Sequence, residues 1–285
     1  MLRLLIRMFL STLPPPVIVV GCHRSGTTLV SNLLQGLGVF MGADLEENAE
    51  SIYFITLNDE LLKMANARWD RPEHARKFVE GPSSGWIQHL KARVHSRGWL
   101  QAYWGQHWAL RMLLGACRGL RWGWKDPRNT LTLPVWLSLF PQARVIIVTR
   151  NGVDVATSLV ARERGQLRDA AWGLAFEDAF SLWEEYVQLG LANTQRVVEQ
   201  RRLGLRYEDL LEDPGGWLMR IRSFLQLQTT NSQISALCAM VDSTRSRRYL
   251  QSPELMERYN ACRRRPSMLT LGFDYGDSAA VAHRS

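Results

Sequence analysis

A short glycine-rich segment near the start of the chain has the residue types and spacing of a phosphate-binding loop. Residues 21–28 read GCHRSGTT, in which four residues separate two glycines and two threonines follow the second. Between a strand and a helix, such a loop turns successive backbone N–H groups toward a phosphate, and the helix start adds partial positive charge. The lysine that spans the β- and γ-phosphates in nucleoside-triphosphate loops is replaced by Thr27, and the cation is Arg24 within the loop. The pattern favours one phosphate, bound by Thr27 and Thr28, followed by a transferable group at which Arg24 is directed.

A second set of polar side chains is suited to another anion. Arg150 ends the segment ARVIIVTR, and Ser158 follows eight residues later. A guanidinium is a forked, permanently charged donor and serine adds a short hydroxyl donor, so the pair suits a phosphate dianion. The alternative for Arg150 is a salt bridge at a strand end. A basic cluster either closes over such an anion or lies solvated on the surface; it comprises Arg245, Arg247 and Arg248.

The hydrophobic pattern places these residues at the ends of buried strands. Residues 17–20 (VIVV) and 145–148 (VIIV) are β-branched runs typical of strands covered on both faces, and residues 203–207 predict a third strand. Apolar residues at helical spacing over 27–37 predict a helix that stops at Gly38. Alternating strands and helices predict an α/β fold with a P-loop-like parallel sheet flanked by helices.

The remaining segments are expected to complete a single domain over residues 1–285. Residues 52–117 predict a helical insert after the first strand–helix unit, and its tryptophans (69, 86, 99, 104 and 108) are expected mainly in the core, with some available to line an acceptor cleft. Residues 1–13 carry two arginines on one helical face, which predicts a packed terminal turn or, alternatively, a peripheral helix on a membrane surface. Small and polar residues predict a loosely ordered tail at 266–285.

Together these segments resemble sulfotransferases that use 3′-phosphoadenylyl sulfate (PAPS). The sequence RSGTT after a buried strand resembles their 5′-phosphosulfate loop, and Arg150 with Ser158 matches their pair for the 3′-phosphate. The stretch KDPRNTLTLPVWLSLFPQARVIIVTR, which begins at Lys125, is similar in order and spacing to tyrosylprotein sulfotransferases and many bacterial sulfotransferases. The segment RYEDL followed by DP resembles the family's YEDL…P segment. The resemblance covers residues 17–48, 122–160 and 203–226.

The resemblance implies transfer of a sulfuryl group from PAPS to a hydroxyl or amine acceptor, without a metal ion. In the family, the lysine at the position of Lys125 contacts the sulfuryl group and the bridging oxygen, and the tyrosine at the position of Tyr207 lies near the adenine. Arg24 and Lys125 are therefore expected to neutralise charge during transfer. As in bacterial relatives, the acceptor is expected to be a carbohydrate, a lipid-linked glycan or another small molecule. The residues expected to bind PAPS are Arg24, Ser25, Gly26, Thr27, Thr28, Arg150, Ser158 and Tyr207.

Sulfuryl transfer also needs a group that takes the acceptor proton. The cytosolic branch of the family uses a histidine two residues after the lysine, and this position is Pro127 here. The tyrosylprotein branch uses a glutamate that follows a glycine shortly after the first helix, which points to residues 42–50 with a change of length. Each candidate in this segment could equally be a solvated carboxylate; in order of preference they are Glu47, Glu46 and Glu50.

Two further residues are candidates for the transfer site. Asp126 is a fourth possible base, although its place beside Lys125 is better suited to orienting the lysine. His23 stands where relatives often have proline, and it either lies near the sulfuryl group or shapes the turn.

The composition excludes several function classes. Of 285 residues, 46% are hydrophobic and 22% charged, which excludes a largely disordered chain. No run approaches the roughly 18 apolar residues of a membrane span. The net charge of +8 favours anionic partners, but no motif supports binding to nucleic acid. The four cysteines form no CxxC pair and indicate reduced thiols rather than a zinc site. We expect a cytoplasmic protein, with membrane association through residues 1–13 as the alternative.

Two other functions remain as alternatives. A nucleotide or small-molecule kinase would need the displaced lysine and an acidic Mg²⁺ partner after a hydrophobic strand, and neither is present. A non-catalytic protein that binds nucleotides or membrane surfaces is favoured by the basic balance and by the N-terminal arginines.

Overall fold

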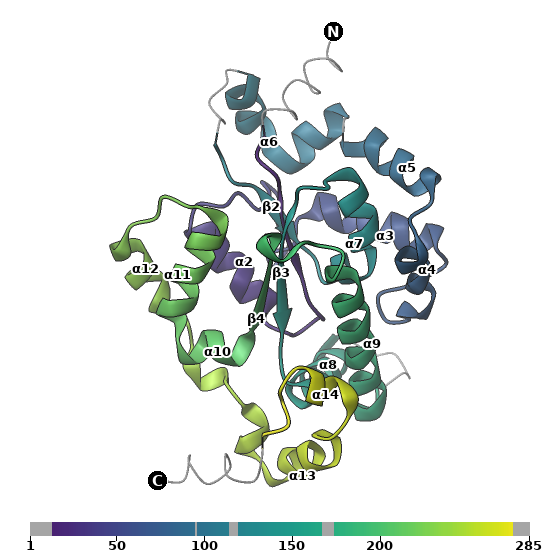
Figure 1. Cartoon of the computed structure of the whole chain (residues 1–285), viewed down its shortest axis with the longest axis vertical. Coiled ribbons are helices and arrows are strands. Elements are labelled where there is room, and N and C mark those ends of the chain that lie inside the picture. Colours follow the sequence, from purple (N-terminus) through teal and green to yellow (C-terminus); the bar gives the residue numbers. More distant parts are fainter. Residues whose placement is uncertain (1–12, 95, 114–118, 167–173, 276–285) are drawn as a thin grey trace.

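The fold is built on a parallel sheet. The computed structural model describes residues 13–94, 96–113, 119–166 and 174–275. Within these residues, four strands form one sheet in the order β2–β1–β3–β4, and every neighbouring pair is parallel (Figure 1). This confirms the predicted α/β class with a P-loop-like parallel sheet. The strands are β1 (Val17–Val20), β2 (Gly123–Lys125), β3 (Arg144–Thr149) and β4 (Arg202–Arg206).

Strand β2 is the one described strand that the sequence analysis did not predict. Its three residues, GWK, give no run of β-branched side chains. The strand exists because it pairs with β1, with Val17 opposite Gly123. A Cβ atom on Gly123 would lie 2.0 Å from the carbonyl oxygen of Val17, so the close pairing depends on glycine at this position.

Side chains of strand β1 alternate between two hydrophobic cores. Ile18 and Val20 belong to one core, while Val17 and Val19 belong to the other, and all four are fully buried. This alternation is the reason that the run VIVV carries no polar residue. The core of Val17 and Val19 is closed by α2 (Thr27–Gly36), α10 (Tyr207–Glu212), α11 (Pro214–Leu225) and α12 (Asn231–Cys238).

The larger core, on the face of Ile18 and Val20, is covered by the remaining helices. Figure 1 shows this group on the opposite side of the sheet from α2, α11 and α12. Short 3₁₀ turns occur at Pro72–Ala75, Glu199–Arg201, Ser243–Arg245 and Arg248–Gln251. The α-helices of this group are α3 (Ile52–Met64), α4 (Arg76–Glu80), α5 (Ser84–Val94), α6 (Arg97–Leu113), α7 (Asn129–Leu139), α8 (Gly152–Gln166), α9 (Phe176–Thr194), α13 (Pro253–Cys262) and α14 (Pro266–Thr270).

The helical insert consists of α3 to α6 within its described residues, which agrees with the prediction for residues 52–117; residues 114–117 lie outside the described part. Its aromatic side chains are mostly core residues, as predicted. Trp99 and Trp104 are fully buried, and Phe54 of α3 stacks on Trp124 of β2 with ring centroids 3.9 Å apart. The stacking of Phe54 on Trp124 joins the insert to β2, the edge strand of the sheet. The side chain of Trp108 lies outside the described part of the chain.

One buried amide also joins the insert to the turn after β2. The Nδ2 group of Asn58 donates to Asp126 Oδ2 and Asn129 Oδ1, each at 2.8 Å. Its Oδ1 atom accepts from Thr132 Oγ1 at 2.7 Å and from Trp136 Nε1 at 2.8 Å. Asn58 is fully buried, and these bonds use both amide protons and both oxygen lone pairs. The position of the turn that follows Lys125 therefore depends on Asn58.

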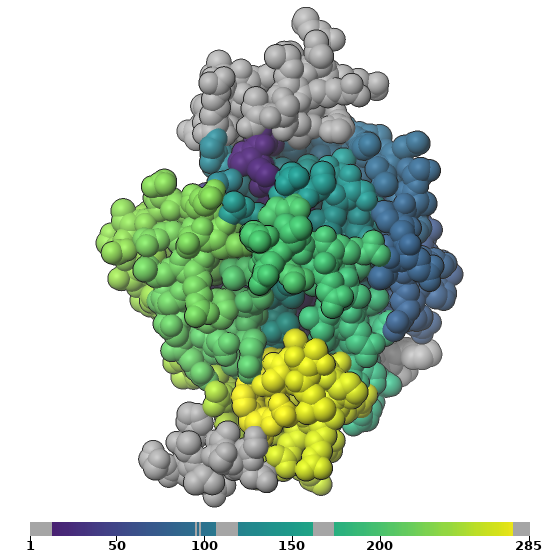
Figure 2. Space-filling view, viewed as in Figure 1, coloured from purple at the N-terminus to yellow at the C-terminus, as the bar shows by residue number. Residues whose placement is uncertain are grey.

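The C-terminal segment is better ordered than the sequence suggested. The expectation of a loosely ordered tail is wrong for residues 266–275, because Met268 and Phe273 are fully buried in the larger core. Burial of these two apolar side chains attaches a segment that otherwise looks polar. Figure 2 shows this part of the chain, in yellow, against the green helices. The rest of that tail, 276–285, lies outside the described residues, as do residues 1–12.

No helix among the described residues is long and apolar enough to cross a membrane. Cys22, Cys238 and Cys262 form no disulfide within the described part of the chain.

We expect the substitution Asn58→Leu to lower the free energy of unfolding by about 2–4 kcal/mol, because it leaves buried polar partners without a hydrogen bond. Urea denaturation measures this change. The matched control is Thr56→Val, on the exposed side of the same helix, which should change stability by no more than about 0.5 kcal/mol. Equal effects of the two variants would contradict this role of Asn58.

Candidate functional site

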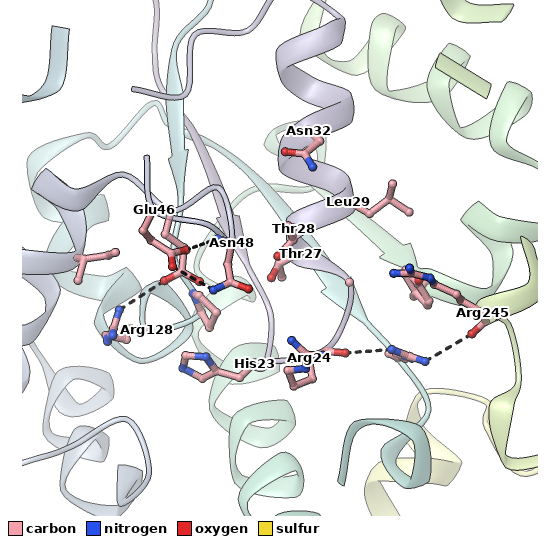
Figure 3. Close-up of a pocket in the computed structure, with 16 residues that line it drawn as sticks. His23, Arg24, Thr27, Thr28, Leu29, Asn32, Glu46, Asn48, Arg128 and Arg245 are labelled. Carbon is pink, nitrogen blue, oxygen red and sulfur yellow. Dashed lines mark hydrogen bonds and ion pairs between the residues drawn. The ribbon is translucent and has the colours of Figure 1, made fainter. Parts of the chain in front are cut away.

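A cavity of about 350 Å³ opens where the carboxyl ends of the strands meet (Figure 3). Because parallel strands run in one direction, the segments after β1, β2, β3 and β4 gather at the same edge of the sheet. Each of the four contributes to the wall. The lining residues that the argument uses are Arg24, Gly26, Glu46, Glu50, Arg128 and Arg150.

The loop after β1 forms one side of the cavity. Gly26 is the N-cap of α2 with φ +91°, and no side chain caps this helix start. The first N–H groups of α2 therefore remain available to a ligand, beside the lining residues Thr27 and Thr28. A Cβ atom at position 26 would lie 2.1 Å from the ring of Tyr207, so the loop and this ring fit together only with glycine.

Arg150 enters the cavity from the end of β3. Its Nη1 donates to the carbonyl oxygen of Arg24 at 3.2 Å, and its Nη2 donates to Asp154 Oδ2 at 3.4 Å. The guanidinium lies 4.6 Å from the centre of the Tyr207 ring. Its buried Nε atom has no hydrogen-bond partner. The arginine is thus held in place from several sides and keeps one buried donor for a ligand.

The segment that carries Arg245 lies over Arg150. Nη2 of Arg150 donates to the carbonyl oxygen of Arg245 at 3.5 Å. Asp154 accepts from the backbone N–H groups of Arg248 and Tyr249 at 3.2 and 2.9 Å. Of the predicted basic cluster, Arg245 lines the cavity, while Arg247 pairs with Glu212.

Arg24 and Ser158, which the sequence suggested for different groups of the ligand, are in direct contact. Arg24 Nε donates to Ser158 Oγ at 2.8 Å. Arg24 has φ +66°, in the left-handed region, and lines the cavity, whereas Ser158 lies behind it. Ser25 differs from its neighbours, because its buried side chain lines a separate cavity of about 20 Å³ beneath the loop.

The carboxylates of residues 42–50 divide between the cavity and the solvent. Residues Leu45 and Ser51 form an antiparallel bridge, and the N–H of Glu46 donates to the carbonyl oxygen of Glu50 at 2.9 Å. The turn between them directs Glu46 and Glu50 into the cavity wall. Glu47, the first candidate for the base, is exposed and does not line the cavity.

Glu50 forms a buried ion pair with Lys125. Lys125 Nζ donates to Glu50 Oε1 at 2.9 Å and to the carbonyl oxygen of Asn48 at 2.5 Å. Arg128 Nη1 lies 3.7 Å from the other oxygen of Glu50. Lys125 is 1% exposed and does not line the cavity, so it reaches the site through Glu50. Asp126 is fully buried below this pair, where it accepts from the N–H of Arg128 at 2.9 Å.

Burial destabilises the charged form of both Glu50 and Lys125. It raises the pKa of Glu50 to about 7, an effect to which the negative charge of Asp126 adds and which the charge of Lys125 opposes. Burial also lowers the pKa of Lys125, against the attraction of Glu50. Glu50 is therefore a carboxylate that can exchange a proton near neutral pH.

Another buried carboxylate, Glu208, binds the backbone that follows Arg150. Glu208 Oε1 accepts from the N–H of Asn151 at 2.9 Å, and burial raises the pKa of Glu208 to about 7. It is 1% exposed and does not line the cavity, so its part is to fix the backbone after β3.

The structure adds wall residues that the sequence analysis did not select, namely Arg128, Asn48 and Ile55. His23, which the sequence analysis did name, also lines the cavity, and its ring lies 4.8 Å from that of Trp69. The position of Arg128, three residues after Lys125 in the segment KDPR, could have indicated it. Nothing in the pattern around Asn48 and Ile55 indicates that they face a cavity. Among the described residues, no cluster of histidine, cysteine, aspartate or glutamate side chains could hold a metal ion.

A family comparison covers most of the chain. The model of the sulfotransferase family matches residues 15–231. No curated protein sequence matches the chain significantly.

Solved structures share the fold at low sequence identity. The sulfotransferase domain from the curacin biosynthetic pathway is 16% identical, with a TM-score of 0.53 over 87% of this chain and 97% of that one. The sulfotransferase domain from the Synechococcus PCC 7002 olefin synthase is 20% identical, with a TM-score of 0.50 over 92% and 95% of the two chains. A sulfotransferase from Alicyclobacillus acidocaldarius is 15% identical, with a TM-score of 0.50 over 94% and 99%. These likenesses support the P-loop-like fold.

We expect the Glu50 carboxyl to titrate near pH 7, which ¹³C NMR of labelled glutamate side chains would measure. The substitution Lys125→Met should move this titration to higher pH, because it removes the positive charge that lowers the pKa of Glu50. A Glu50 titration near the ordinary value of about 4.3 would contradict the buried pair.

Proposed function

The chain belongs to the sulfotransferase family, and on that premise we propose that it transfers the sulfuryl group of PAPS to a hydroxyl or amine acceptor. The observation that carries this proposal is that Arg24 and Arg150 line one cavity at an uncapped helix start. A donor with two separate anionic groups requires two such cationic positions.

The residues present fit a PAPS molecule. The first turn of α2 has the open N–H groups that a 5′-phosphate needs, and Gly26 leaves room for a close approach. The buried Nε of Arg150 lacks a partner, which a 3′-phosphate would supply. Ser158 would support the binding of the donor through Arg24, because its Oγ accepts a hydrogen bond from Arg24 Nε. The Tyr207 ring contacts both the loop, at Gly26, and the guanidinium of Arg150. Ser25 would contribute its backbone rather than its side chain, because the side chain faces away from the cavity.

We assign to Glu50 the role of the general base that takes the proton from the acceptor group. When bound, PAPS supplies an activated sulfuryl group, whose bond to the 5′-phosphate oxygen breaks as the acceptor oxygen or nitrogen attacks the sulfur. Glu50 lines the same cavity and has a pKa near neutral pH, the range in which a carboxylate serves best as a general base. Lys125 holds the Glu50 carboxylate by a hydrogen bond. Arg24 supplies positive charge at the loop.

The position of Glu50 distinguishes it from the other candidates. Glu47 is exposed and lies off the cavity wall. Asp126 is fully buried and held by Asn58 and Arg128. Glu46 lines the cavity, but its oxygens accept from Asn48, and Lys125 bonds to Glu50 instead.

A kinase or a non-catalytic nucleotide-binding protein would use the same fold with a different ligand. We expect calorimetry to show tighter binding of adenosine 3′,5′-bisphosphate than of ADP, without Mg²⁺. The substitution Arg150→Ala should weaken binding of the bisphosphate by about 2 kcal/mol, or roughly thirtyfold, because a charged hydrogen-bond donor is lost.

Arg144→Ala is the control for that variant, because Arg144 stands at the other end of the same strand. It should leave the affinity unchanged. Preference for ADP, or binding that depends on Mg²⁺, would contradict the proposed donor and favour the kinase.

The rate of transfer should depend on the ionisation of Glu50. Because its pKa is raised to about 7 and the base must be unprotonated, kcat/KM should rise with pH through about 7. In Glu50→Gln, kcat should fall by about 100-fold or more and this rise should disappear, while the affinity for adenosine 3′,5′-bisphosphate is retained.

Two glutamine variants separate this assignment from its alternatives. Glu208→Gln removes another glutamate with a pKa near 7, and we expect the rise of kcat/KM with pH to persist in this variant. If Glu47→Gln abolished turnover and Glu50→Gln did not, the base would be Glu47.

A further inference from the structure

The two ends of the cavity differ in charge. One end carries Arg24, Arg150 and Arg245, which suit the anionic groups of a donor. The opposite end is formed by Glu46, Asn48, Glu50, Ile55, Pro127 and Arg128. Figure 3 shows Glu46, Asn48 and Arg128 on one side of the start of α2, and Arg245 on the other side. If the arginine end receives the donor, the acceptor occupies the end with the two glutamates.

The polar atoms at this end are mainly hydrogen-bond acceptors. Glu46 accepts one bond at each oxygen, from the N–H of Asn48 at 2.8 Å and from its Nδ2 at 3.0 Å. A carboxylate has about four acceptor sites, so Glu46 retains capacity for a ligand. Asn48 uses its amide nitrogen on Glu46, and Figure 3 shows its carbonyl oxygen turned toward α2.

The two cations at this end are held by carboxylates of the protein. Arg128 donates to Asp126 Oδ1 at 3.1 Å and pairs through Nε with Asp59 at 3.0 Å. Lys125 is bonded to Glu50 and to the backbone of Asn48. A ligand that complements this wall must therefore bring hydrogen-bond donors of its own.

We propose that the acceptor is a polyhydroxylated compound that is neutral or carries an amine, such as a hexosamine or an aminocyclitol. The inference rests on the proposed function, because it takes the arginine end as the donor site. Hydroxyl and ammonium groups supply hydrogen-bond donors to the oxygens of Glu46 and Asn48.

Two other classes of acceptor fit less well. A lipophilic alcohol would remove water from Glu46 and Asn48 without replacing its hydrogen bonds, and Ile55 and Pro127 offer it little apolar surface in return. An acceptor with a carboxylate or phosphate would place like charge beside Glu46 and Glu50.

The test is a binding panel on the full chain saturated with adenosine 3′,5′-bisphosphate, measured by saturation-transfer NMR. The panel contains glucose, glucosamine, inositol and 2-deoxystreptamine, then glucuronate and inositol phosphate, and finally cyclohexanemethanol and a steroid alcohol. Transfer of ³⁵S from labelled PAPS is measured on the same compounds. We expect the best neutral or amine polyol to bind at least about tenfold more tightly than any member of the other two classes.

Two variants test whether Glu46 determines the preference among acceptors. In Glu46→Gln, the preference for glucosamine over glucuronate should fall by about tenfold, while the affinity for adenosine 3′,5′-bisphosphate is unchanged. Asp44→Asn removes the same charge two residues away at an exposed position off the cavity, and it should leave the preference as it is.

The outcomes separate this inference from the proposed function. Tight binding of the bisphosphate together with a lipophilic or anionic compound as the best acceptor would overturn the inference and leave the sulfotransferase proposal standing. Binding of the bisphosphate with no binding of any polyol would also overturn it. Failure to bind the bisphosphate would contradict the proposed function itself.

Discussion

Parallel pairing of β1 with strands on both sides is the constraint on which the site depends. Because β2 and β3 run in the same direction as β1, the residues that follow these strands emerge at one edge of the sheet. The loop after β1, Pro127 and Arg128 after β2, and Arg150 after β3 are more than a hundred residues apart at their extremes, yet they line one cavity. A small shift in strand register would separate them.

The helical insert serves this edge as well as the core. Phe54 stacks on Trp124 and Asn58 binds Asp126, so one helix fixes both the strand and the turn at its end. The segment just before this helix carries Glu46 and Glu50 to the cavity. The insert thereby links core packing to the geometry of the proposed acceptor end.

The ion pair beside the cavity also shows that burying charged groups is energetically unfavourable. Removing Lys125 and Glu50 from water is unfavourable for both, and their mutual attraction offsets only part of that penalty. The result is a carboxylate whose proton affinity lies near neutrality, which a solvated glutamate would not have. Arg150 shows a related arrangement, because the protein holds its guanidinium in place while its buried Nε lacks a partner.

What the sequence by itself determined was local. The run VIVV, the loop GCHRSGTT and the run VIIV each define a strand or turn through short-range periodicity and glycine spacing, and the structure confirms those elements. Strand β2 was missed, because its three residues are held by pairing with β1 rather than by their own propensity. The ordered end at Met268 and Phe273 was missed because burial of two side chains is a long-range effect.

The tertiary structure decided which side chains face the cavity. The sequence analysis ranked Glu47 before Glu46 and Glu50, whereas in the turn closed by the bridge between Leu45 and Ser51 it is Glu46 and Glu50 that line the cavity and Glu47 that is exposed. The contact between Arg24 and Ser158 joins residues 134 positions apart, a separation that no local pattern encodes. Direction of a side chain depends on backbone turns and on distant packing partners, and these exist only once the chain has folded.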